Sequence, residues 1–167
     1  EKEDRLKIAG ENEHLSLSPA STTKIMTCLV VLEQADLNED VVVSENASLT
    51  EGSSAYLRKG EHLTVKELLY CLMLASANDA ATALAEHVAG SIEDFAAMMN
   101  EKAREIGCEN TCFLTPNGLD QTVTDENGTT LLHSTTASDL GRMMAYCVWQ
   151  SPERAAFLKI TRTSSAS

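Results

Sequence analysis

Residues 18–33 read SPASTTKIMTCLVVLE, and this stretch decides the architecture around which the rest of the chain must pack. Ser18 is a favourable N-cap and Pro19 fits the first position of a helix. Residues 25–32 are almost entirely apolar. A helix that is apolar on every side belongs in the centre of a core rather than on the surface. The sequence therefore predicts a central, buried helix that starts after Ser18 and ends near Ala35.

The same helix carries a reactive pair, Ser21 and Lys24. Ser21 falls in the first turn, where unpaired backbone N–H groups and the helix dipole favour negative charge on oxygen. Lys24 follows three residues later, so the two side chains share one helical face. Apolar surroundings disfavour the ammonium form, so the amine is suited to take the hydroxyl proton of Ser21. The alternative is a capping serine and a solvated lysine, but a lysine inside an apolar run is rarely found without a reason.

Further along the chain the pattern is dominated by helices with clear boundaries. Thr64 and Glu67 have the spacing of a capping box at the start of an apolar stripe. Comparable signals predict more helices: one ending near Val88 and closed by Gly90, one from Ser91 to Gly107, one opening at Thr136, and a short one from Ser151 through Leu158.

Strand signals are sparse. Residues 5–9, 41–43 and 111–115 are the candidate strands. Residues 44–60 and 116–134 have the composition of long loops, which in a compact domain are often functional. The pattern as a whole predicts a helix-rich cluster with a few strands.

A second polar feature, the segment Ser76-Ala77-Asn78-Asp79, interrupts two helical patterns where an apolar stripe could have continued. A serine hydroxyl is able to relay a proton to a leaving amine, and an asparagine amide is able to hold a carbonyl group or orient a lysine. Taken alone, a helix break with Asn78 or Asp79 as N-cap is the simpler interpretation.

Together, Ser-x-x-Lys and Ser-x-Asn are two of the three motifs of penicillin-binding proteins and β-lactamases. The resemblance extends in order through residues 18–33, 52–91, 115–120 (TPNGLD) and 134–140 (STTASDL). Over these stretches the chain is similar to the serine-type D-alanyl-D-alanine carboxypeptidases, the low-molecular-weight penicillin-binding proteins that trim cell-wall stem peptides. The resemblance implies an α+β, penicillin-recognising domain, in which a helical cluster packs on an antiparallel sheet and the active site lies in the cleft between them.

The resemblance also implies a role for each motif residue. Ser21 is expected to be the acylated nucleophile and Lys24 its general base. Ser76 is expected to relay a proton, and Asn78 to position Lys24 and the substrate. Family members usually have glycine where this chain has Ala77, but the spacing is kept, so only a modest effect on the cleft is expected.

The implied partners are a peptidoglycan stem peptide ending in D-Ala-D-Ala and β-lactam antibiotics as acylating inhibitors, and no cofactor is needed. Because peptidoglycan lies outside the cytoplasmic membrane, the resemblance further implies an exported protein of the bacterial cell envelope.

The third family motif, Lys-Thr-Gly on a sheet strand, does not occur in residues 1–167. In the family this strand lies further downstream, supplies an oxyanion N–H group and holds the substrate carboxylate. Residues 5–13 resemble the second strand of an opening hairpin that has no first strand before it. We therefore expect residues 1–167 to form a partial domain without its first strand and its Lys-Thr-Gly strand. The remainder would lie outside this sequence or in a separate chain, because the helices alone would expose a large apolar face.

Composition excludes other classes of function. Lys plus Arg is 13 and Asp plus Glu is 25, which gives a net charge of −12. Such an acidic chain without a basic cluster is a poor candidate for binding nucleic acid or an anionic membrane surface. The longest apolar run, residues 68–75, is far shorter than the roughly 20 residues that a membrane span needs.

The metal-ligand residue types show no pattern typical of a metal site. Cys28, Cys71 and Cys147 sit in apolar helical patterns and are predicted to be small buried side chains. Cys108 and Cys112 could form a disulfide or supply two zinc ligands, but no matching pair follows them. The histidines are scattered and predicted to lie on the surface or in loops: His14, His62, His87 and His133. A metallopeptidase is therefore disfavoured.

Two other functions remain as alternatives. A β-lactamase shares both motifs, but a class A enzyme would add a glutamate on a loop after Ser-x-Asn, and residues 111–120 contain none. A non-catalytic peptidoglycan-binding or regulatory relic is supported only by the absence of Lys-Thr-Gly.

Overall fold

The computed structural model describes residues 10–124 and 127–164 of the chain, so the predicted strand at residues 5–9 lies outside the described residues. The elements follow in this order: η1 (Ala20–Thr23), α1 (Lys24–Gln34), β1 (Asp40–Val42), α2 (Glu45–Ser48), β2 (His62–Thr64), α3 (Val65–Leu74), α4 (Asn78–Ala89), α5 (Ile92–Glu105), β3 (Thr122–Thr124), β4 (Thr130–Leu132), α6 (Ala137–Ala145), η2 (Tyr146–Gln150) and α7 (Arg154–Thr161).

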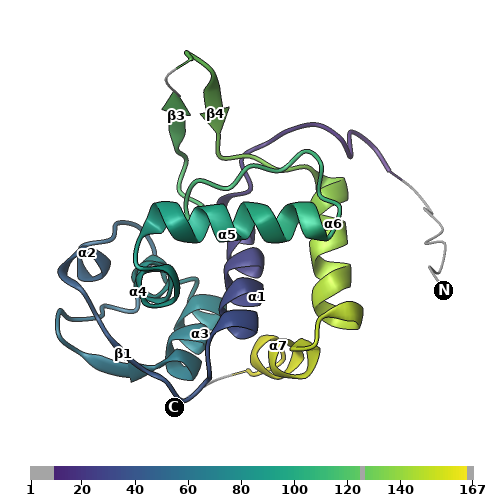
Figure 1. Cartoon of the computed structure of the whole chain (residues 1–167). Coiled ribbons are helices and arrows are strands. Elements are labelled where there is room, and N and C mark those ends of the chain that lie inside the picture. Colours follow the sequence, from purple (N-terminus) through teal and green to yellow (C-terminus); the bar gives the residue numbers. More distant parts are fainter. Residues whose placement is uncertain (1–9, 125–126, 165–167) are drawn as a thin grey trace.

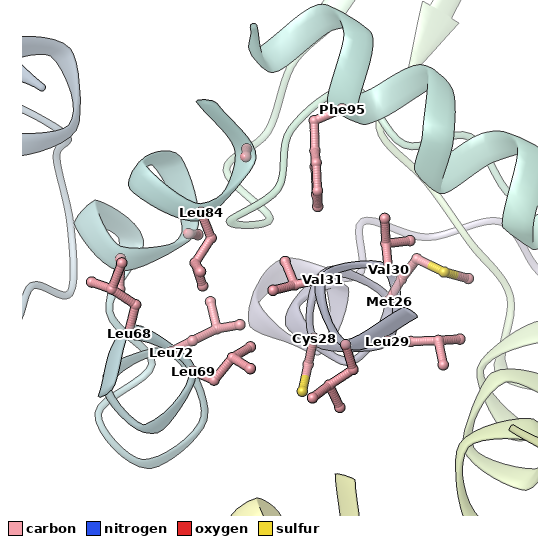
Figure 2. Packing of buried hydrophobic residues seen from close by; sticks show 14 of the residues in the cluster. Met26, Cys28, Leu29, Val30, Val31, Leu68, Leu69, Leu72, Leu84 and Phe95 are labelled. Atoms are coloured by element: carbon pink, nitrogen blue, oxygen red, sulfur yellow. The ribbon is translucent and has the colours of Figure 1, made fainter. Parts of the chain in front are cut away.

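The predicted central helix is confirmed as α1. Helices α3 and α4 lie on one side of it, α6 on the other, α5 across one end and α7 near the opposite end (Figure 1). Figure 2 shows the side chains that meet around it, with Leu72 of α3, Leu84 of α4 and Phe95 of α5 directed towards α1. Each of these side chains is almost completely buried. Burying one such side chain contributes roughly 1.5–3 kcal/mol, so the α1 contacts are a main source of stability.

The start of the central helix differs from the prediction. Ser18 does not cap it, because its hydroxyl donates to Asp120 instead. Pro19 occupies the cap position, and a 3-10 turn, η1, precedes the first α-helical residue, Lys24. Both the backbone N–H and the hydroxyl of Thr22 donate to the Pro19 carbonyl, which accounts for the tight turn. The predicted end near Ala35 is confirmed.

Other helix boundaries follow their local signals. The capping box of Thr64 and Glu67 is present with both of its reciprocal hydrogen bonds. Gly90 ends α4 in the left-handed conformation that favours glycine. The last helix was predicted over residues 151–158, but its boundaries are shifted towards the C-terminus. The π-helical turn η2 ends at Gln150, the Ser151 hydroxyl donates to Glu33, and α7 spans Arg154–Thr161.

The described strands form two separate antiparallel pairs, β1 with β2 and β3 with β4. Of the predicted strands, residues 41–43 are confirmed in part by β1. The prediction for residues 111–115 was wrong, because only an isolated bridge joins Cys112 to Ser134. The β3–β4 hairpin lies in a predicted loop and projects from the helical body (Figure 1). The fold is thus α+β, a helical cluster with small antiparallel sheets.

The remaining predictions concern individual side chains. All five cysteines are free, so Cys108 and Cys112 do not form a disulfide, and the Cys108 thiol donates to a backbone carbonyl. His133 lies in the loop after β4, which fits its prediction as a surface or loop residue, but it is buried rather than on the surface. In the described part of the chain no three acidic, histidine or cysteine side chains gather as a metal site would require. None of the described helices has the length and apolar character of a membrane span.

Candidate active site

Lys24 is the centre of the candidate site. It is the first residue of α1 and only 3% exposed. Its Nζ atom lies 3.2 Å from Ser21 Oγ, 2.7 Å from Asn78 Oδ1 and 2.8 Å from the Asn117 carbonyl oxygen. Loss of hydration by burial lowers the pKa of Lys24 to about 8. The interpretation of Lys24 as a solvated surface lysine is therefore wrong.

The three partners also orient the amine. Asn78 Oδ1 and the Asn117 carbonyl oxygen have no proton to give, so each accepts one N–H of Lys24. A neutral amine has two N–H groups and one lone pair. When both N–H groups are used by these oxygens, the lone pair is left for the third partner, the Ser21 hydroxyl. This arrangement is suited to general-base activation of Ser21.

Ser21 lies in η1, directly before α1, and its side chain is exposed. The 3-10 turn places it three residues before Lys24 and on the same side of the helical segment. The hydroxyl is thus accessible from solvent while its base is buried. A nucleophile that must reach a substrate needs this combination.

Asn78 reaches the site from a different part of the chain, at the start of α4. Its Nδ2 group donates to the Glu51 carbonyl at 2.7 Å, so the amide oxygen faces Lys24. Its backbone N–H donates to the Ser53 carbonyl at 2.7 Å. Gly52 lies so close that an added Cβ would be 2.5 Å from Asn78 Nδ2. The loop before β2 therefore fixes the amide that contacts the lysine.

The carboxylate of Asp79 holds the same loop in place. Its carboxylate is 1% exposed and accepts hydrogen bonds from Ser54 Oγ and from the backbone N–H groups of Ala55 and Leu57. Burial alone would raise the pKa of this carboxyl, but these hydrogen bonds outweigh it and lower the pKa. The residue after Asn78 thus holds the loop that orients Asn78.

Ser76 lies at the break between α3 and α4, two residues before Asn78. Its φ of 54° is unusual for a residue other than glycine, and at this residue the chain turns away from the end of α3. Its hydroxyl makes no hydrogen bond to any residue in the described ranges, so the structure brings Ser21, Lys24 and Asn78 together but does not join Ser76 to them. Ala77 has a φ of −68°, which alanine adopts without strain.

Residues 113–121 close the site. The sequence predicts most of them as part of a long loop and includes residues 115–120 in the family resemblance, but it assigns none of them a role at Lys24. This segment supplies the Asn117 carbonyl to Lys24 and the Pro116 carbonyl to Thr27 Oγ1, at 2.6 Å. Both contacts use backbone oxygens, which any residue type has, so residue identity gave no signal. A further local signal is the Asn117-Gly118 pair, which is typical of a tight turn.

Gly118 makes a contact that only glycine allows. Its φ is +88°, and an added Cβ would lie 1.9 Å from the Ala20 carbonyl oxygen. The turn of residues 115–119 is therefore packed directly against η1, one residue before the nucleophile. This close approach fixes the turn that binds the Lys24 amine relative to η1, the turn that precedes Lys24.

Comparison with known proteins identifies the family of this chain. The family model described as D-alanyl-D-alanine carboxypeptidase, peptidase family S11, matches residues 7–166. The chain belongs to this carboxypeptidase family.

The chain is similar to several members of this carboxypeptidase family. D-alanyl-D-alanine carboxypeptidase DacF of Bacillus subtilis is 44% identical over 117 residues, which are 67% of this chain and 30% of that protein. D-alanyl-D-alanine carboxypeptidase DacD from Francisella tularensis has a similar structure, with a TM-score of 0.82, 31% identity, and coverage of 92% of this chain and 36% of that one. The structure of penicillin binding protein 5 from Haemophilus influenzae is also similar, with a TM-score of 0.77 and 29% sequence identity. The match covers 90% of this chain and 43% of that one. The chain spans about a third of the length of the curated relatives it matches.

Proposed function

We propose that the protein to which this chain belongs is a serine-type D-Ala-D-Ala carboxypeptidase that removes the terminal D-alanine from peptidoglycan stem peptides. The observation that supports this proposal most strongly is the buried Lys24 amine, held by two oxygen acceptors with its third partner being Ser21 Oγ. The family membership supports the substrate class.

In the proposed reaction, the neutral amine of Lys24 takes the Ser21 proton while Oγ bonds to the carbonyl carbon between the two D-alanines. The resulting oxyanion collapses, the C–N bond breaks, and the departing amine receives a proton that originates from Lys24 and passes through the Ser76 hydroxyl. Asn78 holds the lysine and the substrate carbonyl in register. Water then attacks the ester carbon and gives one proton to Lys24. The bond between that carbon and Oγ breaks, and Lys24 passes the proton to Ser21 Oγ, which restores both residues.

Mass spectrometry of the full-length protein after incubation with benzylpenicillin tests the proposal. We expect one stable covalent adduct on Ser21, and none in Ser21→Ala. A full-length protein that folds but gains no adduct would contradict the proposal. Rapid turnover of the β-lactam without a lasting adduct would instead indicate a β-lactamase of the same superfamily.

We further propose that residues 1–167 are part of a penicillin-recognising domain whose remaining strands, including one with Lys-Thr-Gly, lie outside this chain or in a separate chain. The partial coverage of the structural relatives supports this. An adduct on residues 1–167 alone, formed at the rate of the full-length protein, would contradict it. Because its substrate is peptidoglycan, we propose that the protein acts outside the cytoplasmic membrane, in the cell envelope, with β-lactams as inhibitors.

A further inference from the structure

His133 is a buried side chain next to the site to which neither the motifs nor the proposed reaction gives a role. It follows β4 and is 4% exposed. Its ring packs against Phe113, with 5.8 Å between ring centroids. Its backbone N–H donates to the Gln121 carbonyl at 3.0 Å. The ring is therefore held from several sides against residues 113–121, the segment that closes the site.

The contacts of the ring define its tautomer. Nδ1 is 2.9 Å from the backbone nitrogen of Leu114 and 3.3 Å from that of Thr115. Both nitrogens carry protons, so Nδ1 must be the unprotonated acceptor. The proton of the neutral ring is then on Nε2, which donates to Thr23 Oγ1 at 2.9 Å.

The two ends of the ring thus join the two halves of the site. Nε2 binds Thr23, the residue that immediately precedes Lys24. Nδ1 binds the start of the 115–119 turn, in which Thr115 Oγ1 accepts from Gly118 N at 3.2 Å. The same turn supplies the Asn117 carbonyl that accepts from Lys24. The ring therefore bridges the residue before the lysine to the turn that orients it.

A protonated ring cannot make these contacts. Its Nδ1–H would face two N–H groups, which leaves buried donors without an acceptor and destabilises the arrangement. Burial lowers the pKa of His133 below its ordinary value of 6.5, against the opposing effect of Asp120. Among the charged groups of the described residues, Asp120 is the one that acts on the pKa of the ring. Lys24 directly follows Thr23, the residue to which Nε2 donates.

We propose that His133 is a positioning residue for the acylation of Ser21, whose neutral ring ties the 115–119 turn to the nucleophile turn, and whose protonation releases the Asn117 carbonyl from Lys24. This inference rests on the proposed function, because it concerns the reaction assigned to Ser21. It extends that function by giving the enzyme a second proton-sensitive step besides the lysine itself.

The test is the pH dependence of acylation by benzylpenicillin, measured on the full-length protein from about pH 9 to about pH 4.5. If Lys24 alone titrates, the rate constant falls about tenfold per pH unit below its pKa. With His133 also required in its neutral form, the fall steepens towards about a hundredfold per unit at the acid end. Circular dichroism at each pH verifies that the protein stays folded.

The matched variant is His133→Asn, whose amide oxygen keeps an acceptor near the place of Nδ1 but does not titrate. We expect a rate several-fold lower at pH 9 and a fall of only about tenfold per unit throughout. His133→Phe, which loses both contacts, should acylate roughly 10- to 100-fold more slowly. His62→Asn, which changes an exposed histidine of β2 paired with Asp40, should match the wild type in rate and profile.

A wild-type profile that falls only tenfold per unit, or a steep acid end that persists in His133→Asn, would overturn the inference. Failure of the proposed function is distinguishable, because the wild-type protein would then give no Ser21 adduct at any pH.

Discussion

Lys24 is held by two oxygens that only accept hydrogen bonds, and this detail determines how the residue should respond to substitution. Replacing it with methionine keeps most of the stem in place but removes the amine, so Asn78 Oδ1 and the Asn117 carbonyl each lose a donor. Lys24→Met should acylate roughly 10²- to 10⁴-fold more slowly, the contribution expected of a general base. A quantitative adduct time course measures this. Near wild-type rates would mean that Lys24 is not the base.

The lowered pKa of Lys24 also sets a pH dependence for stability. Burial lowers its pKa from 10.5 to about 8, so between these values the unfolded chain binds more protons than the folded one. Stability from this group therefore rises with pH across that window and is lowest below it. Chemical denaturation at pH 8 and pH 10 should show a larger gain for the wild type than for Lys24→Met. Equal gains would contradict the assignment.

Substitution of Gly118 tests how closely the 115–119 turn must pack against η1. Gly118→Ala would place a methyl group into the Ala20 carbonyl, and backbone on both sides leaves little room to yield. We expect acylation to fall at least tenfold, because small displacements near reacting atoms have large effects on rate. Gly60→Ala is the matched control, since Gly60 has a similar positive φ but nothing within 4 Å of the added Cβ. Similar rates in both variants would exclude the steric explanation.

At the scale of elements, the capping box predicts a measurable contribution. Thr64→Ala removes the hydroxyl that accepts from the Glu67 backbone at the start of α3. Loss of such a cap destabilises a protein by about 1 kcal/mol. Glu67→Gln keeps a side-chain acceptor for the Thr64 N–H and should lose less. Urea denaturation of both variants would detect the difference, and a larger loss in Glu67→Gln would contradict it.

Elements with strong local signals were predicted well, and the reasons are physical. Ser91 and Thr136 cap helices because their hydroxyls satisfy backbone N–H groups within the same turn, which is visible in sequence. The β3–β4 hairpin was missed because its strands are three residues long and exposed on both faces, and so short a run is below the length at which alternation indicates a strand. The contacts of the closing segment escaped notice because they depend on distant packing and on backbone oxygens.

At the scale of the whole molecule, stability should depend on the cluster around α1 far more than on the hairpin. Phe95 is fully buried and directed towards α1 (Figure 2), so Phe95→Ala should cost about 3–5 kcal/mol. Leu132 of β4 is 57% exposed, and Leu132→Ala should change stability by only about 0.5 kcal/mol or less. Thermal denaturation of the full-length protein compares them. Similar losses would show that the hairpin is as important as the core.

The groups around the Lys24 amine come from stretches of the chain that are far apart, since Asn78 is 54 residues and Asn117 93 residues away from it. An unfolded copy keeps Ser21 and Lys24 as near neighbours but has nothing to dehydrate or aim the amine. Under the proposed chemistry, a fluorescent penicillin would therefore tag only molecules whose helices have assembled. The tagged fraction of a preparation would serve as a direct count of correctly folded copies, readable on a gel without any purified substrate.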